Sequence, residues 1–464
     1  MVSLRDGSLE TVVDDTELGL GLRVVHKASM GFAATAELDA DAAVGVADQA
    51  VALARATAPT LAVPVVLAEE PLVGTATWTS AYDVDPTTIP LNDKVERLAE
   101  WSARLLGERG IDHVAAYVLC VVEDKLFADL AGARVSQRRV RVHPVVEAYA
   151  VDAATGSFES MRTLAPPAGR GWEYLTGSGW DWDTELAELP ELLAAKVASP
   201  SVEAGVYDLV IEPSNLWLTI HESIGHATEL DRALGYEAAY AGTSFATFDQ
   251  LGSLQYGSPV MQVTGDRTAE HGLATVGFDD EGVAAQKFDL VRDGVLVGYQ
   301  LDRRMAAENN LGRSNGCSFA DSPLHIPIQR MANVSLRPAD AEGPTTEELV
   351  SDVDRGILVA GDKSWSIDMQ RHNFQFTGQR FFRIDRGRLA GQVKDVAYQS
   401  RTTDFWGSLD AVGGRSTYVL GGAFNCGKGQ PGQVAPVSHG CPSALFRGVR
   451  VLNARAEAGF PGAS

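Results

Sequence analysis

The sequence contains few of the features that characterise secreted and membrane proteins. Only four of its 464 residues are cysteine, which is sparse for a scaffold held together by disulfides. No stretch approaches the ~18–20 consecutive apolar residues that a membrane-spanning helix requires. The N-terminal stretch from Met1 to Gly7 is followed by acidic residues rather than by the apolar run of a signal peptide. We therefore expect a cytoplasmic protein that does not associate with membranes.

Positively charged residues are also scarce. The chain has 39 Lys and Arg against 61 Asp and Glu, which gives a net charge of −22. Such a surface repels phosphate backbones, so we do not expect direct binding to nucleic acid. The one short basic run, Arg138-Arg139-Val140-Arg141, alternates with apolar residues, and we interpret it as the outer face of a strand.

The remaining composition is that of a large folded protein. Hydrophobic residues make up 45% of the chain and charged residues 22%, and its length allows two or three domains. The stretch from Ala198 to Ser201 has the composition of a linker. We therefore predict an N-terminal domain over residues 1–200 and a C-terminal domain over residues 201–464.

The two predicted domains differ in their expected secondary structure. Apolar periodicity predicts helices over Ala40–Ala56, from a cap at Asn92 to Gly107, and over Glu185–Val197. Continuous apolar runs predict strands over 115–122, 135–142 and 145–151. Beyond residue 254, short apolar runs alternate with glycine-containing turns that are typical of hairpins. We expect an α+β protein in which a layered α/β domain is followed by a β-rich, antiparallel, barrel-like domain.

One short segment concentrates side chains that bind metals. The motif His221-Glu222-Ser223-Ile224-Gly225-His226 lies on a helix that is predicted from Leu216 onward, just after a predicted strand. Imidazole nitrogen is a preferred zinc ligand, and a carboxylate beside a zinc-bound water can take its proton. In the common H-E-x-x-H signature the histidines are four residues apart, whereas here they are five apart.

The extra residue has a geometric consequence. A helix advances about 100° per residue, so residues five apart lie about 140° apart and cannot share one ion. Two local structures would bring His221 and His226 together. A π-bulge would restore their alignment, or the helix would end at Gly225 and present His226 from a turn. A glycine immediately before His226 suits both structures.

A catalytic zinc site usually has three protein ligands and an open position for water. We favour Cys426 as the third ligand because it lies in a glycine-rich loop, where the nearby Lys428 would favour the thiolate. The other candidates that the sequence leaves open are Glu229, His271, His372, His439 and Cys441, with Cys317 as a weaker one.

These stretches resemble the TldD/PmbA family of metallopeptidases, and in particular its TldD-like, metal-binding type. The resemblance covers most of the chain. It is carried by 205–210, by the histidine motif with its continuation to Asp231, by the stretch from Gln329 to Val334, and by the late loop from Asn425 to Gln430.

The resemblance implies a zinc ion held by His221, His226 and Cys426, with Glu222 as the general base. It also implies a peptidase that hydrolyses unstructured peptides or trims leader peptides. Members of the family form dimers, in which the partner can be a homologous subunit that lacks the metal motif. No other cofactor is expected. Glu229 would either orient a ligand histidine or only keep the helix soluble.

Two other functions compete with catalysis. In the first, the chain is a non-catalytic, zinc-stabilised subunit of a peptidase complex, a class of subunit that we expect to lack ligands. In the second, the zinc only supports folding, as in structural sites that are closed by four ligands. A fourth ligand from His439 or Cys441 would favour this second function.

Overall fold

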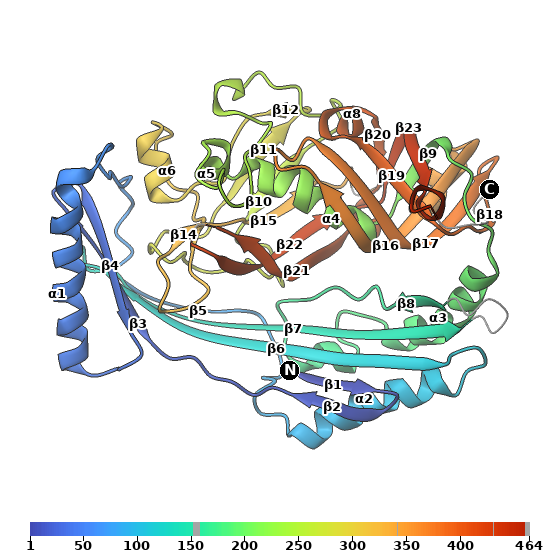
Figure 1. The fold of residues 1–464 in the computed structure, drawn as a ribbon, viewed down its shortest axis with the longest axis horizontal. Coiled ribbons are helices and arrows are strands. Elements are labelled where there is room, and N and C mark those ends of the chain that lie inside the picture. Colours follow the sequence, from blue (N-terminus) through green and yellow to red (C-terminus); the bar gives the residue numbers. More distant parts are fainter. Residues whose placement is uncertain (152–157, 341, 430, 460–464) are drawn as a thin grey trace.

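A long β-hairpin extends across most of the molecule (Figure 1). The structure is a computed structural model that describes residues 1–464 except 152–157, 341, 430 and 460–464. The hairpin consists of β6 (His113–Ala128) and β7 (Arg134–Val151), paired in register from His113 opposite Tyr149 to Ala128 opposite Arg134. In Figure 1 the C-terminal half of the chain lies above this hairpin, and helix α2 lies below it.

The hairpin is the centre of a six-stranded sheet in the order β2-β1-β6-β7-β5, in which β8 pairs with the other end of β7. Strand β5 runs parallel to β7, and the other pairs are antiparallel. Helices α2 and α3 pack together through the stacked rings of Trp101 and Trp182, 4.5 Å apart. The remaining elements of this layer are β1 (Val2–Arg5), β2 (Ser8–Val12), β5 (Thr75–Thr79), β8 (Phe158–Arg162), α2 (Leu91–Leu106) and α3 (Trp182–Ala198).

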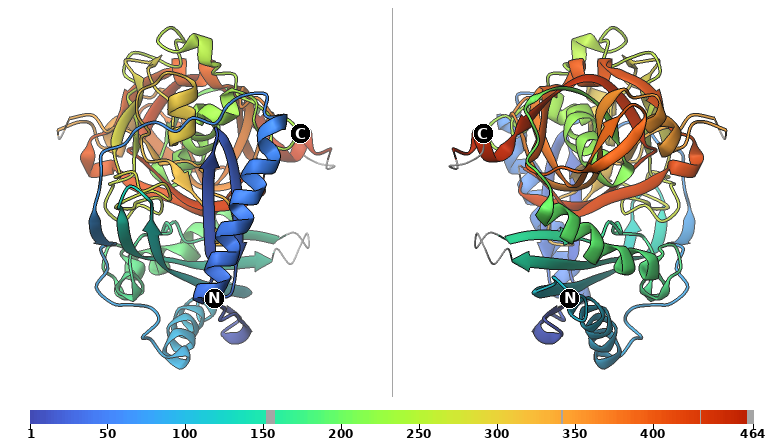
Figure 2. Two further views of the ribbon diagram at one scale, coloured as in Figure 1. Left: turned by 90° about the vertical axis from the view of Figure 1, so that its left-hand side faces the viewer. Right: turned by 90° about the vertical axis from the view of Figure 1, so that its right-hand side faces the viewer.

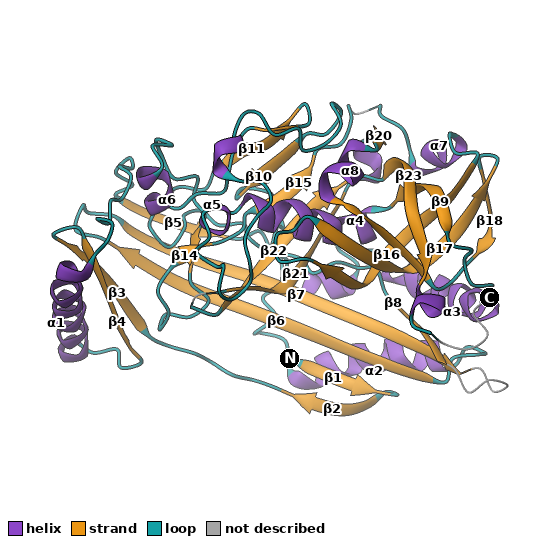
Figure 3. Ribbon diagram, turned by 45° about the horizontal axis from the view of Figure 1, so that its top comes forward, coloured by secondary structure: helices purple, strands orange, loops and turns teal. Residues whose placement is uncertain are grey.

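Strand β7 corrects the prediction of two separate strands over 135–142 and 145–151. It is continuous, as Figure 3 shows, although Pro144 lies in its middle. Proline cannot donate to a ladder, so it is confined to positions where a strand has a neighbour on one side only. Strand β5 pairs with β7 as far as Arg138, and β8 pairs with β7 only from Glu147 onward. Pro144 therefore lies between the stretches paired with these two strands, and its ladder partner is Val118 of β6.

The helix predictions hold apart from their boundaries. Helix α1 spans Ala40–Thr57, and it packs on the hairpin of β3 (Leu20–His26) and β4 (Ser29–Thr35). The capping role predicted for Asn92 is wrong, because α2 begins at Leu91 directly after Pro90 and has no side-chain cap. Helix α3 begins three residues earlier than predicted, where the Asp181 side chain accepts from the Thr184 N–H.

The C-terminal half contains a closed five-stranded barrel. Its strands follow one another in the order β16-β9-β23-β19-β17, and a further pairing of β17 with β16 closes the ring. All neighbours are antiparallel except β9 and β16. Figure 2 shows these strands curving round above the N-terminal sheet. The barrel and its attached strands are β9 (Gly205–Ile211), β16 (Arg355–Ile367), β17 (Asn373–Asp385), β18 (Arg388–Gln392), β19 (Val396–Arg401), β20 (Leu409–Val412) and β23 (Ala444–Asn453). The expectation of an α+β protein with a β-rich, barrel-like second part is therefore confirmed.

Smaller sheets and short helices surround the barrel. A four-stranded sheet has the order β12-β11-β10-β15, and β13–β14 and β21–β22 form two-stranded sheets. The strands are β10 (Val263–Asp266), β11 (Lys287–Arg292), β12 (Val295–Leu296), β13 (Ser318–Phe319), β14 (Ile328–Gln329), β15 (Asn333–Leu336), β21 (Val419–Lys428) and β22 (Gln433–Cys441). The helices are α4 (Pro213–Ile220), α5 (Leu230–Ala233), α6 (Arg303–Glu308), α7 (Thr346–Ser351), α8 (Thr402–Gly407) and α9 (Ala454–Glu457).

Two large hydrophobic clusters form the interior. One joins α2 and α3 to the N-terminal sheet, and the other fills the C-terminal half around the barrel and α4. These separate cores support a division of the chain at residues 200 and 201, which stays a prediction. None of the described helices is both long enough and apolar enough to span a membrane.

Candidate metal centre

The helix that carries the two histidines changes its pitch at the first of them. Helix α4 begins with Pro213, a residue whose fixed φ suits the first helical position. From His221 to Gly225 the chain forms a π turn, in which the His226 N–H donates to the His221 carbonyl oxygen, five residues back. A short 3-10 turn, His226–Thr228, follows. Of the two structures that the spacing allowed, the π-bulge is therefore the one present, and it brings the two imidazole centroids within 4.7 Å.

Gly225 serves the turn by its small size. Its φ of −52° is ordinary for a helix, so residues other than glycine could adopt this backbone conformation. A Cβ atom at this position would lie only 2.5 Å from the Met331 sulfur and 2.9 Å from its methyl group. The glycine therefore allows the stretch that contains Met331 to pack directly against the π turn.

The third member of the group, Cys426, comes from strand β21, 200 residues after His226. The register of β21 against β22 shifts between Ala423 and Cys426, and such a bulge redirects the side chains of a strand. Cys426 Sγ lies 3.5 Å from His226 Nε2. Ligand atoms of His221, His226 and Cys426 all lie within 4.8 Å of one another, and the three residues are at most 5% exposed.

Both histidines hold their second ring nitrogen in a hydrogen bond. His226 Nδ1 lies 2.9 Å from Glu229 Oε2, and His221 Nδ1 lies 2.8 Å from His439 Nε2. The Nε2 atom of each ligand histidine is thereby left for the cluster. Glu229 is completely buried, so its carboxylate does not act as a solvated group on a helix surface.

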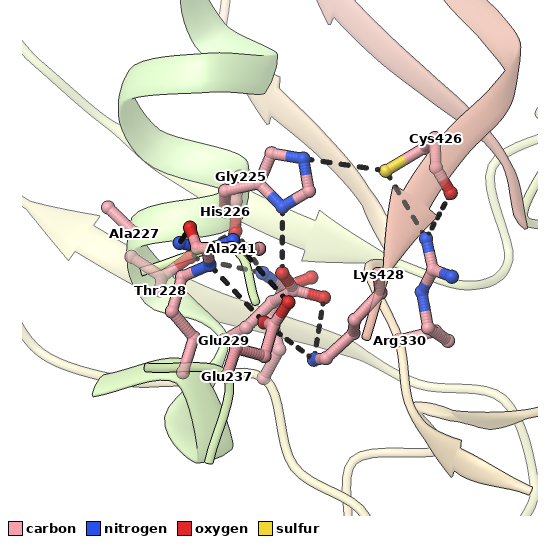
Figure 4. A network of polar contacts seen from close by, with 12 residues as sticks. Gly225, His226, Ala227, Thr228, Glu229, Glu237, Ala241, Arg330, Cys426 and Lys428 are labelled. Carbon is pink, nitrogen blue, oxygen red and sulfur yellow. Dashed lines mark hydrogen bonds and ion pairs between the residues drawn. The ribbon is translucent and has the colours of Figure 1, made fainter. Parts of the chain in front are cut away.

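Lys428 anchors the Glu229 carboxylate from the side away from His226 (Figure 4). Its Nζ lies 2.7 Å from Asp231 Oδ1, 3.1 Å from Glu229 Oε1 and 3.8 Å from Glu237 Oε1. Burial alone would lower the pKa of Lys428, but the three carboxylates outweigh it and raise that pKa. The lysine is thus a permanent cation that fixes Glu229, and with it the orientation of His226.

Arg330, and not Lys428 as the sequence predicted, is the cation beside the Cys426 sulfur atom. One terminal nitrogen of the Arg330 guanidinium lies 3.3 Å from Cys426 Sγ, and the same nitrogen donates to the Cys426 carbonyl oxygen. Burial would raise the pKa of the Cys426 thiol, but His226 and Arg330 outweigh it and lower that pKa. The thiolate, which is the form that binds metal, is therefore favoured. Arg330 lies in one of the stretches that carry the family resemblance, although its role was not apparent there.

Glu222 is buried beside the cluster and forms an ion pair with Arg371. Burial would raise the pKa of Glu222, but the neighbouring His221 and His226 and the Arg371 guanidinium outweigh it and lower that pKa. The carboxylate is therefore ionised and able to accept a proton. No motif in the sequence marked Arg371, which comes from the turn between β16 and β17 and has a φ of +63°.

The structure excludes the other candidate ligands from the cluster. His271 Nδ1 contacts the Gly169 carbonyl oxygen at 3.1 Å, and the His372 ring stacks on Phe245. Cys317 is buried, and burial raises the pKa of its thiol to about 12, so it stays protonated. In the described residues, no other group of at least three potential ligand side chains is close enough to share an ion.

His439 and Cys441 do not provide a fourth ligand. Both ring nitrogens of His439 are engaged, because Nδ1 lies 2.8 Å from the Val334 carbonyl oxygen and Nε2 faces His221. The Cys441 sulfur lies 3.8 Å from the Pro213 carbonyl oxygen, and burial raises the pKa of its thiol. The arrangement is therefore a three-ligand group, which is the number found at catalytic rather than at structural zinc sites.

Two family models and several known proteins match this chain. Residues 204–453 match the family model described as the PmbA/TldA metallopeptidase C-terminal domain, and residues 1–54 match the model for domain 1 of the same metallopeptidases. A metalloprotease of Methanocaldococcus jannaschii is 24% identical over 444 residues, which cover 95% of this chain and 91% of the relative. A metalloprotease of Methanothermobacter thermautotrophicus is 27% identical over 458 residues, or 97% and 92% of the two chains.

Two further similar proteins bear on the metal and on the fold. A zinc metalloprotease TldD homolog of Saccharolobus solfataricus is 22% identical over 278 residues, which cover 59% of this chain and 57% of the relative. A crystal structure from Thermotoga maritima, described as a modulator of a DNA gyrase, superposes with a TM-score of 0.75 at 16% identity. That superposition covers 97% of this chain and 93% of the other, and at this identity it shows a shared fold.

Proposed function

Because the chain belongs to the PmbA/TldA metallopeptidase family, we propose that it is a zinc-dependent peptidase whose metal is held by His221, His226 and Cys426. The observation that carries this proposal is the three-ligand group itself, two imidazoles and one thiolate brought together by a π turn and a strand bulge. Imidazole and thiolate are the donors that suit zinc.

The surroundings of the three side chains fit a zinc ion. The two histidines present Nε2 to the cluster because their Nδ1 atoms are engaged by Glu229 and His439. His226 and Arg330 lower the pKa of the Cys426 thiol, which favours the thiolate, the form that binds metal. One homologue with this family relationship carries the name zinc metalloprotease.

Glu222 is the proposed general base. Bound zinc would lower the pKa of a coordinated water and polarise the scissile carbonyl. The Glu222 carboxylate would take the proton of that water and pass it to the leaving amine. Arg371 holds the same carboxylate in the ionised form, and its pairing with Glu222 fixes where the proton is received.

We propose that the substrate is an unstructured peptide, including leader peptides, that binds as an added strand. Among the described strands, β21 has a ladder partner only on its β22 side, and it carries Cys426. Main-chain hydrogen bonds to such an edge do not depend on the peptide's side chains, so they would give affinity with broad sequence tolerance.

The location and assembly of the protein are also proposals. The free thiol of Cys426 must stay reduced to bind metal, which favours the cytoplasm. The family resemblance favours a dimer, with a second copy or with a homologous subunit that lacks the metal motif. Co-purification from the native host followed by mass spectrometry would identify that partner.

A non-catalytic, zinc-stabilised subunit is the competing function. It would retain metal without any base, or would close the site with a fourth protein ligand. This chain has Glu222 beside its three candidate ligands. Both ring nitrogens of His439 are occupied by His221 and the Val334 carbonyl, and the Cys441 sulfur faces the Pro213 carbonyl. The three-ligand arrangement therefore supports catalysis.

The decisive experiment is to replace Glu222 with Gln and to measure peptide hydrolysis and zinc content together. We expect Glu222→Gln to bind zinc like the wild type and to lose roughly 10²- to 10⁴-fold in kcat on a flexible peptide. The same substitution at Glu203, whose side chain is exposed, is the matched control and should leave both quantities unchanged.

Two results would contradict the proposal. The first is full activity of Glu222→Gln with normal zinc content, which would show that another group takes the proton. The second is a wild-type protein that unfolds when zinc is removed by a chelator but shows no hydrolysis when zinc is restored, which would favour the structural function.

A further inference from the structure

His439 lies directly behind the first candidate ligand, His221. It comes from strand β22, is completely buried, and its ring centroid lies 4.8 Å from that of His221. The indole of Trp217 lies nearly parallel to the His439 imidazole, with centroids 6.3 Å apart and an interplanar angle of 11°. The ring is thus held between its neighbours and cannot turn freely.

The partners of His439 determine which of its nitrogens carries the proton. The Val334 carbonyl oxygen, 2.8 Å from Nδ1, can only accept a hydrogen bond, so His439 Nδ1 must be the donor. In the neutral ring Nε2 is then an acceptor, and the hydrogen bond at 2.8 Å must come from His221 Nδ1. This leaves His221 with a lone pair on Nε2, which is the nitrogen left for the cluster.

We propose that His439 is a positioning residue that fixes the tautomer and the ring orientation of His221 for metal binding. The inference rests on the proposed metal site. Ligand histidines usually donate their second N–H to a carboxylate, a backbone carbonyl or a water. Here the neutral imidazole of His439 takes that place. Because its Nδ1 donates to the Val334 carbonyl, its Nε2 is left to accept from His221 Nδ1.

The consequence is a chain of two hydrogen bonds whose direction is set by a backbone atom. The reversed direction would place the proton of His221 on Nε2 and leave no lone pair for an ion. Removal of such supporting partners lowers metal affinity by about 10- to 100-fold. The effect concerns the binding of the metal, so it is measurable without any assay of peptide hydrolysis.

Three substitutions at position 439 separate the two hydrogen bonds. His439→Leu removes both. His439→Gln can place its amide oxygen near the former Nε2 and accept from His221. His439→Asn reaches only the former Nδ1 position, so it can bond Val334 but leaves His221 Nδ1 without a partner. Each full-length variant would be prepared metal-free, and its zinc dissociation constant would be measured by competition with a chromophoric chelator.

We expect His439→Leu and His439→Asn to raise the zinc dissociation constant about 10- to 100-fold, and His439→Gln to remain within about threefold of the wild type. Cys441→Ala is the matched control, because Cys441 lies on the same strand and is equally buried but does not contact His221. The absorption spectrum of the cobalt-substituted protein should shift for Leu and Asn and stay unchanged for Gln.

Two outcomes would overturn the inference. One is wild-type zinc affinity in the Leu and Asn variants, and the other is an equal loss in all three variants, which would indicate a role in packing only. If the Leu variant does not fold, the comparison of Gln with Asn decides. A wild-type protein that binds no zinc would overturn the proposed metal site itself, which distinguishes that failure from a failure of the role of His439.

Discussion

Two charge clusters in this molecule, one buried and one partly buried, have an excess of opposite charge. In the first, beside the candidate metal centre, Lys428 lies among three carboxylates, Glu229, Asp231 and Glu237. Glu237 also pairs with the buried Arg232, so this cluster holds three carboxylates and two cations. In the second, on the long hairpin, Glu123 faces three cations, one of which, Lys125, pairs more closely with Asp280 at 2.9 Å. One Arg139 terminal nitrogen lies 2.5 Å from Glu123 Oε2, Arg141 contacts the same oxygen, and Lys125 is 3.9 Å from Oε1.

The difference lies in what each cluster contacts. Lys428 reaches the candidate ligand His226 through Glu229, and the excess of carboxylates there suits the charge of a nearby divalent cation. The cations around Glu123 instead pack on an aromatic ring of the C-terminal half. Lys125 and Arg139 lie 4.3 and 5.3 Å from the centroid of Phe319. We infer that the first cluster couples folding to metal binding, whereas the second contributes to stability alone.

The largest expected effect comes from Lys428→Met, which keeps the length of the side chain and removes its charge. Glu229 and Asp231 would then lack this cation, while Glu237 would keep its pair with Arg232. Breaking a buried pair in this way costs about 3–5 kcal/mol. We expect the free energy of unfolding to fall by about that amount in urea denaturation. Zinc affinity should fall as well, because Glu229 would lose the contact that orients it toward His226.

The matched control for this variant is Lys363→Met. Lys363 is exposed on β16, so the same substitution there should change the free energy of unfolding by less than about 0.5 kcal/mol. A Lys428→Met protein with normal stability would show that Glu229 and Asp231 do not need this cation. A destabilised variant with unchanged zinc affinity would break the proposed coupling of this cluster to the metal.

A smaller effect is expected from Glu123→Gln. The amide keeps the shape of the side chain but no longer balances Arg139 and Arg141, whose guanidinium groups are almost completely buried. Loss of the charged hydrogen-bond partner of two buried arginines costs roughly 1–3 kcal/mol, which thermal or urea unfolding would detect. Zinc affinity should be unchanged, and Glu96→Gln, at an exposed position of α2, should change neither quantity. Weakened zinc binding in Glu123→Gln would remove the distinction between the two clusters.

The same two clusters show how far the sequence could be interpreted. Local signals predicted the helices, the hairpins and the metal-binding motif, because periodicity, turn residues and spacing are properties of neighbouring residues. The cap predicted at Asn92 was nevertheless wrong. The basic run at 138–141 was correctly placed on a strand, but its interpretation as an outer face was wrong. Arg139 and Arg141 are buried because Glu123, on the neighbouring strand, and the C-terminal half cover them.

The remaining site residues required contacts between distant parts of the chain. Arg330 and His439 contact the candidate ligands Cys426 and His221 from 96 and 218 residues away along the chain. Arg371 contacts Glu222 from 149 residues away, and no local pattern encodes such contacts. The π turn was one of two structures compatible with the spacing. Met331, which packs closely against Gly225 in this turn, is again far away in the sequence. Spacing and chemistry could therefore nominate ligands, whereas their supporting contacts depended on the tertiary fold.

The smallest predicted effect uses pH to test the Glu123 cluster without further mutation. Burial would raise the pKa of Glu123, but the guanidiniums of Arg139 and Arg141 outweigh it and hold that pKa well below its ordinary value. A carboxyl whose pKa is lower in the folded than in the unfolded chain stabilises the fold fully above the unfolded value of about 4.3. That stabilisation is lost progressively as the pH falls toward the folded value. The difference in unfolding free energy between wild type and Glu123→Gln should therefore be constant from pH 7 to about 5 and should shrink by roughly 1–2 kcal/mol by pH 3. A difference that persists undiminished to pH 3 would mean that the carboxylate's charge contributes nothing, and that only its shape supports the arginines.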